Sequence, residues 1–124
     1  REIQTVTLYK LMKAFEKVVQ KLQERNNKPV HTVVHYNYTM EDVREYILST
    51  SSTHKTLTFE KIFDVCIDRI HAIFIFLNLL ELVQQKYLQM IVGEGRNNFI
   101  IEWNENREEE VLAPLMDESF STLN

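Results

Sequence analysis

A long apolar helix dominates what this chain of 124 residues can fold into. The run from Arg69 to Leu88, RIHAIFIFLNLLELVQQKYL, places apolar residues on almost every side of a helical projection. A surface helix needs only one apolar stripe to pack on a domain core. When a helix is apolar nearly all round, its second side must also be buried. In a domain this small, we expect that side to be buried against a partner.

Composition argues against several classes of function. The formal net charge of −4 argues against nucleic acid as the main partner, because phosphate binding needs a basic face. The apolar run Ile70 to Val83 is interrupted by Asn78 and Glu81 and is too short to span a bilayer. The single cysteine, Cys66, excludes a disulfide framework within the chain and fits a reduced, cytoplasmic setting. Since the chain starts at Arg1, almost directly in a helical pattern, we expect a fragment of a longer protein.

An amphipathic helix is predicted from Thr7 to Arg25. Its apolar residues recur at the i, i+3, i+4, i+7 spacing of one helical face. They are Leu8, Leu11, Met12, Phe15, Val18, Val19 and Leu22. The turn cluster from Asn26 to Pro29 ends the helix. The stripe can pack on the following domain as a core element, or it can fill a groove on another protein. The sequence leaves both interpretations open.

The middle of the chain alternates between extended and helical patterns. Val30 to Tyr38 is rich in β-branched and aromatic residues, which predicts a strand. Thr39 and Asp42 resemble a capping box that begins a helix from Met40 to Leu48. The polar segment Ser49 to Thr56 is predicted to be a loop.

The second half of the chain predicts two helices and a hairpin. Thr58 caps a short helix, whose apolar face carries Phe59, Ile62, Phe63 and Cys66. Asp68 caps the long apolar helix, which runs to Gln85. Two strands follow, Tyr87 to Val92 and Phe99 to Trp103, joined by a glycine-containing turn.

Three helices followed by a hairpin form the winged-helix arrangement, whose third helix often lies in a DNA major groove. We therefore predict a fold that is mainly α with a small β hairpin (α+β). An amphipathic linker helix occupies residues 1–29, the winged-helix domain 30–104, and an acidic, partly disordered tail 105–124. The third helix offers Ile73, Phe76 and Leu80 at its middle, and such side chains cannot read base edges by hydrogen bonds. The fold suggests DNA, but the residues argue against it.

No convincing catalytic or metal-binding set emerges from the sequence. His31 and His35 lie about 13 Å apart along a strand, too far to share one zinc ion. Cys66 is better explained as a buried thiol than as a nucleophile paired with His71. Glu81 is better explained as a solvent-facing or paired carboxylate than as a proton carrier. We expect no catalytic residue, cofactor or metal, and a non-enzymatic protein; an enzyme that uses Cys66 or Glu81 is the weakest alternative.

Three stretches carry a resemblance to a known family. Thr7 to Phe15 is similar to a Leu-Tyr-x-Leu-x-x-Ala helix, and Thr58 to Phe63 is similar to a Phe-x-x-Leu-Phe segment. Phe76 to Val83 is similar to a Phe-Leu-Ala-Leu-Leu-Glu-Leu signature, with Asn78 at the alanine. In this order and spacing, the chain resembles the C-terminal half of segregation and condensation protein A, the bacterial kleisin, from about Val6 to Trp103.

The resemblance implies a scaffold role in chromosome condensation and segregation. Its winged helix would bind the ATPase head of an SMC protein, and the region before it would recruit a dimer of segregation and condensation protein B. It implies a cytoplasmic, nucleoid-associated protein that reaches DNA only through the complex and has no membrane contact. The interface residues predicted on this basis are Phe59, Ile62, Phe76, Leu79, Leu80, Tyr87, Leu88, Leu8, Leu11 and Phe15.

The residues leave two further options open. A DNA-binding winged-helix transcriptional regulator is the rival from another class, and a steep salt dependence of duplex binding would mark it. The fragment could also self-associate through its surplus apolar surface.

Overall fold

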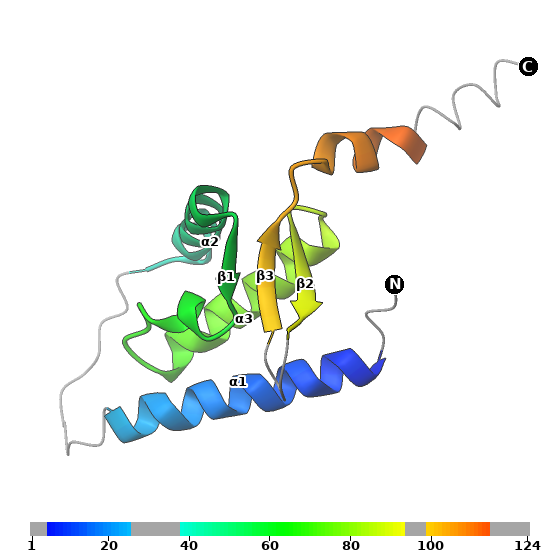
Figure 1. Ribbon diagram of the computed structural model, residues 1–124. Helices are drawn as coiled ribbons and strands as arrows, with labels where there is room; N and C mark the ends of the chain where they lie inside the picture. Colours follow the sequence, from blue (N-terminus) through cyan, green and yellow to red (C-terminus); the bar gives the residue numbers. More distant parts are fainter. Residues whose placement is uncertain (1–4, 26–37, 94–98, 115–124) are drawn as a thin grey trace, which may run out of the picture.

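The computed structural model describes residues 5–25, 38–93 and 99–114 (Figure 1). The elements in chain order are α1 (Thr5–Arg25), α2 (Met40–His54), β1 (Thr56–Thr58), the 3-10 turn η1 (Lys61–Phe63), α3 (Arg69–Gln84), β2 (Leu88–Val92) and β3 (Phe99–Trp103). A further helical stretch covers residues 107–114. The predicted fold class is confirmed, because helices predominate and a small antiparallel sheet completes an α+β, winged-helix-like arrangement.

The core forms around α3, which packs against α1, α2 and β2 (Figure 1). Its inward side carries Ala72, Ile75, Leu79 and Leu82, all without solvent exposure. Successive members of this set are three or four positions apart, so one stripe of the helix faces the core. Other elements contribute Ile47, Ile62, Leu88, Phe99 and Ile101 to the same cluster.

The sheet has three antiparallel strands in the order β1-β3-β2. The predicted hairpin is confirmed, with Leu88 opposite Trp103 and Val92 opposite Phe99. The strand β1 was not predicted, because its residues lie in and beside the segment expected to be a loop. It pairs Leu57 with Ile101 on the other edge of β3 and buries the Leu57 side chain. One apolar residue between two threonines is too short an alternation of apolar and polar residues to predict a strand.

The capping box at the start of α2 is confirmed. The Thr39 hydroxyl accepts a hydrogen bond from the Asp42 N–H, and the Asp42 carboxylate accepts one from the Thr39 N–H, both at 3.0 Å. The predicted loop at Ser49 to Thr56 is wrong, because α2 continues to His54. The polar side chains are accommodated within the helix. Ser49 donates to the Tyr46 carbonyl and Ser52 to the Ser49 carbonyl.

Between α2 and α3, the side-chain oxygens of Asp68 and Thr58 accept hydrogen bonds from backbone N–H groups. The predicted cap at Asp68 is confirmed: its Oδ1 accepts from the His71 N–H at 2.8 Å and from the Tyr38 hydroxyl at 3.1 Å. The Thr58 hydroxyl accepts from the Lys61 N–H at 3.3 Å, but the helix expected there is the single turn η1. The predicted strand from Val30 to Tyr38 lies outside the described residues except for Tyr38, which has no regular structure.

The structure resolves the two interpretations of α1 in favour of a core element. Its stripe of Leu11, Ala14, Val18 and Leu22 is buried. Beside that stripe, Phe15 stacks on Phe76 of α3 with ring centroids 4.4 Å apart.

Polar contacts fix the C-terminal end of α1 on the segment that precedes α3. The Lys21 ammonium lies 2.9 Å from the Glu60 carboxylate, and Arg25 donates to the Cys66 carbonyl at 2.9 Å. Helices α1 and α3 therefore lie side by side and run in opposite directions (Figure 1).

Candidate protein-interaction surfaces

The outward side of α3 is apolar and only partly covered. Ile70 and Leu77 are 39% and 49% exposed, and Ile73 and Leu80 are half-buried beside them. Successive members of this set are three or four residues apart, so they form one stripe along the helix, roughly opposite the core stripe. The expectation of a second apolar side on this helix is thus met in the structure.

Helix α1 extends this stripe into a wider surface. Met12 and Leu8 are 44% and 47% exposed, and they lie one and two turns before Phe15 on the same side of α1. Because Phe15 stacks on Phe76, this side of α1 adjoins the outward stripe of α3. We call the combined surface the two-helix face. Its members are Leu8, Met12 and Phe15 of α1 with Ile70, Ile73, Leu77 and Leu80 of α3.

Most of the residues predicted as interface positions lie inside the chain's own core. The buried ones are Phe59, Ile62, Phe76, Leu79, Leu88 and Leu11. Phe15, Leu80 and Tyr87 are partly buried against the core, and Leu8 is exposed. Only the last four present side-chain surface to a partner without rearrangement of the core. Ile70, Met12 and Leu77 are exposed apolar positions that the sequence analysis did not select.

A second candidate surface surrounds Tyr87, at the turn between α3 and β2. The guanidinium carbon of Arg107 lies 3.8 Å from the centroid of the Tyr87 ring, and that of Arg44 lies 5.3 Å from it. Gln85 holds both arginines: its side-chain oxygen accepts from Arg44 at 3.0 Å, and its carbonyl accepts from Arg107 at 2.9 Å. We call these four residues, Arg44, Gln85, Tyr87 and Arg107, the arginine–tyrosine cluster.

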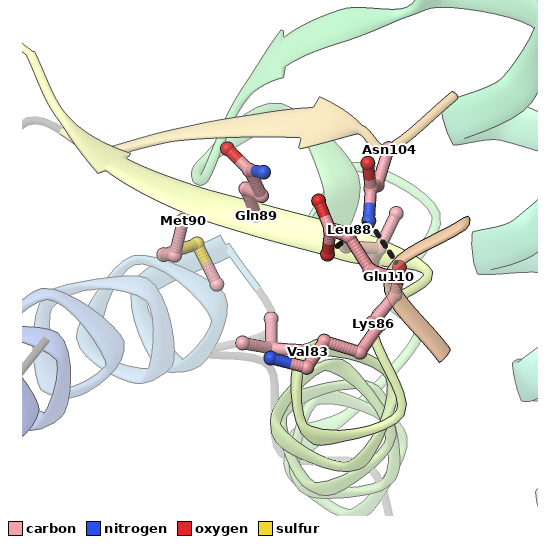
Figure 2. Close-up of a pocket in the computed structure, with 7 residues that line it drawn as sticks. All are labelled: Val83, Lys86, Leu88, Gln89, Met90, Asn104 and Glu110. Atoms are coloured by element: carbon pink, nitrogen blue, oxygen red, sulfur yellow. Dashed lines mark hydrogen bonds between the residues drawn. The ribbon is translucent and has the colours of Figure 1, made fainter. Parts of the chain in front are cut away.

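A hollow of about 370 Å³ lies beside the same turn (Figure 2). Val83, Leu88 and Met90 provide apolar lining, and Asn104 closes one end. The Asn104 amide nitrogen donates to the Lys86 carbonyl at 2.7 Å and to the Glu110 carboxylate at 3.1 Å (Figure 2). These bonds satisfy the polar end of the hollow internally and tie the 107–114 helix to the turn. The hollow is therefore a minor recess rather than a built ligand site.

The groups considered for catalysis, Cys66, His71 and Glu81, have different surroundings. Cys66 is 4% exposed, and burial raises the pKa of its thiol to about 12, so the reactive thiolate is suppressed at neutral pH. His71 stacks on Tyr38 with ring centroids 4.1 Å apart, and burial lowers its pKa. Glu81 lies on the exposed side of α3. Among the residues that the structure describes, no group of three or more His, Cys, Asp and Glu side chains could hold a metal ion.

The environment of Cys66 predicts an unreactive thiol in the folded chain. We expect iodoacetamide at pH 8 to modify Cys66 at least about a hundredfold more slowly in the native protein than in urea, because the thiol is both buried and protonated. Mass spectrometry of timed samples measures the rate. Equal rates in the two conditions would show that the thiol is exposed in solution.

Within residues 5–25, 38–93 and 99–114, no helix combines the length and the apolar character that crossing a bilayer requires.

Comparison with known proteins supports the family resemblance. Segregation and condensation protein A of Streptococcus sanguinis is 33% identical over 91 residues, which cover 73% of this chain and 39% of that protein. The protein of the same name from Clostridium botulinum is 24% identical over 110 residues, which cover 89% of this chain and 44% of that protein. This chain thus spans less than half the length of either relative. No family model matches the chain, and no solved structure matches it at a significant level. The resemblance predicted from its motifs is confirmed: over most of its length, the chain is similar to segregation and condensation protein A.

Proposed function

We propose that this chain is part of a non-enzymatic kleisin scaffold that acts in chromosome condensation and segregation, and that its two-helix face binds the ATPase head of an SMC protein. The names of the two relatives support the role in segregation and condensation. The observation that carries the assignment of a protein partner is the exposed apolar stripe on α3, centred on Leu77 at 49% exposure. Contiguous apolar patches on small soluble domains commonly mark protein contacts.

The chemistry of the two-helix face suits a protein surface better than a nucleic acid. Its members are aliphatic or aromatic, so they offer dispersion contacts and surface to bury but no charge-assisted hydrogen bonds. Leu77, at 49% exposure, lies between the half-buried Ile73 and Leu80 in the α3 stripe, and we assign it the role of a central anchor. Interfaces gain most of their affinity from such central anchors.

The rest of the assembly is part of the same proposal. A dimer of segregation and condensation protein B would bind the region before the winged helix. The complex would lie in the cytoplasm at the nucleoid, and this chain would reach DNA only through its partners. We propose the division into residues 1–29, the winged-helix domain in 30–104 and an acidic tail in 105–124, with α1 of the first part packed into the core of the winged-helix domain.

The experiment is a pair of binding assays on the purified chain. In the first, an immobilised SMC head fragment from the same organism should retain the chain at both 50 and 500 mM salt, because salt screens charges but leaves apolar contacts in place. In the second, a gel shift with duplex DNA at 50 mM salt should show no complex. Failure to bind the head, together with a DNA complex that weakens steeply with salt, would instead support the DNA-binding regulator.

A further inference from the structure

We propose that the arginine–tyrosine cluster binds a carboxylate side chain presented by a protein partner. The identity of that partner, the SMC head, rests on the function proposed above, whereas the carboxylate site rests on the cluster itself. The site would add a charged, directional contact to the apolar contacts of the two-helix face.

The first observation is an uncompensated pair of positive charges. Arg44 and Arg107 are both half-buried and lie near one tyrosine ring, at 5.3 and 3.8 Å from its centroid. Within the residues that the structure describes, neither guanidinium forms an ion pair with a carboxylate; both donate instead to the neutral groups of Gln85. Two partly desolvated like charges near one ring repel each other, so an anion bound between or beside them would be stabilised.

The second observation is that both arginines are already positioned. The hydrogen bonds to Gln85 and the contacts with the Tyr87 ring hold each guanidinium in place, which reduces the conformational entropy lost when a ligand binds. Arg107 uses its Nε–H for the Gln85 carbonyl, and no hydrogen bond within the described residues uses its two terminal nitrogens. A carboxylate is the planar group that such a fork binds through two parallel hydrogen bonds.

The surrounding charge favours one carboxylate over a polyanion. Glu108, Glu109 and Glu110 follow Arg107 directly in the 107–114 helix, so a phosphate backbone that extends past the cluster would meet negative charge. A single aspartate or glutamate side chain carries one negative charge, so it meets less of this repulsion than a polyanion does. The half-buried Trp103 ring, whose centroid lies 6.5 Å from that of Tyr87, places apolar surface beside the cluster for the methylene groups of that side chain.

The site can be tested without the SMC head. In NMR titrations of the isotope-labelled chain with glutarate, a small dicarboxylate, we expect the signals of the Arg107 Nε–H and the Trp103 indole N–H to shift and saturate in the millimolar range. The Arg44→Gln and Arg107→Gln variants should each weaken this binding by about tenfold. The Lys61→Gln variant loses one positive charge at the exposed turn η1 and should titrate like the unchanged chain. Amide spectra establish that each variant is folded.

The outcomes separate this proposal from the proposed function. Absence of glutarate-dependent shifts at the cluster, or equal affinity of the Arg107→Gln variant, would overturn the carboxylate site whatever the SMC head does. A duplex DNA complex that is lost in Arg107→Gln would also overturn it, in favour of a phosphate site. If glutarate binds as expected, the SMC head should bind Arg107→Gln about tenfold more weakly than Lys61→Gln. A head that binds neither the unchanged chain nor the variants contradicts the proposed function and leaves the carboxylate site standing.

Discussion

The Leu79→Ala variant is expected to lose about 3 kcal/mol of unfolding free energy, a large fraction of the stability of a small domain. Leu79 has no solvent exposure and lies at the centre of the inward stripe of α3, between Ile75 and Leu82. Truncation removes buried methyl groups and leaves a cavity that the surrounding helices and sheet can only partly close. Urea unfolding followed by circular dichroism measures the change, provided that the slope of the transition is unchanged.

Leu77→Ala is the matched control for this stability effect. The two leucines are two positions apart on the same helix, but Leu77 is 49% exposed and leaves little cavity when truncated. We expect its cost to stay within about 1 kcal/mol. Equal losses for the two variants would mean that both sides of α3 are covered in solution and would contradict the division of this helix into a core stripe and an outward stripe.

The Leu77→Asp variant is expected to fold and to lose at least about thirtyfold in affinity for the SMC head. Aspartate at this position stays hydrated in the free chain, but binding through the two-helix face would bury its charge against apolar groups. A loss of 2 kcal/mol or more at a central interface residue corresponds to about thirtyfold or greater weakening. Isothermal titration calorimetry against the purified head measures the affinity.

Val65→Asp is the control for this interface effect. Val65 has nearly the same exposure, 46%, but lies in the turn between η1 and α3, and it belongs to neither the two-helix face nor the arginine–tyrosine cluster. The substitution adds the same negative charge, so general effects of that charge appear equally in both variants. An equal loss of affinity for Leu77→Asp and Val65→Asp would contradict an interface centred on α3.

Local signals in the sequence were enough to predict the caps and the hairpin. Thr39 with Asp42, and Asp68 ahead of the apolar run, satisfy the free N–H groups at helix starts, and this chemistry depends on residues close in the sequence. The pairing of β2 with β3 is likewise a local hairpin. The α2 extension was missed because serine and threonine favour caps and turns in isolation. Here Ser51 is buried, and Ser49 and Ser52 bond back to the preceding turn.

The division of α3 into core and outward stripes could not be predicted in the same way. When a helix has no polar side, its sequence does not indicate which side faces the core. For this reason Leu79 and Leu80 were predicted to lie in the interface, and Leu77 was not. The direction is set by contacts distant in sequence, above all the stack of Phe15 on Phe76 and the packing of α2 and β2 on the other side. The arginine–tyrosine cluster has the same origin, because its members come from α2, the turn after α3 and the 107–114 helix.

The central claim is that the outward stripe of α3 is a docking surface for the SMC head. The most direct measurement is methyl NMR of the labelled chain with and without the unlabelled head. We expect the methyl signals of Ile70, Ile73, Leu77 and Leu80 to shift or broaden on binding, while those of the exposed Val65, which belongs to neither proposed contact surface, stay in place. Binding that perturbs Val65 and leaves the α3 stripe unchanged would contradict the claim.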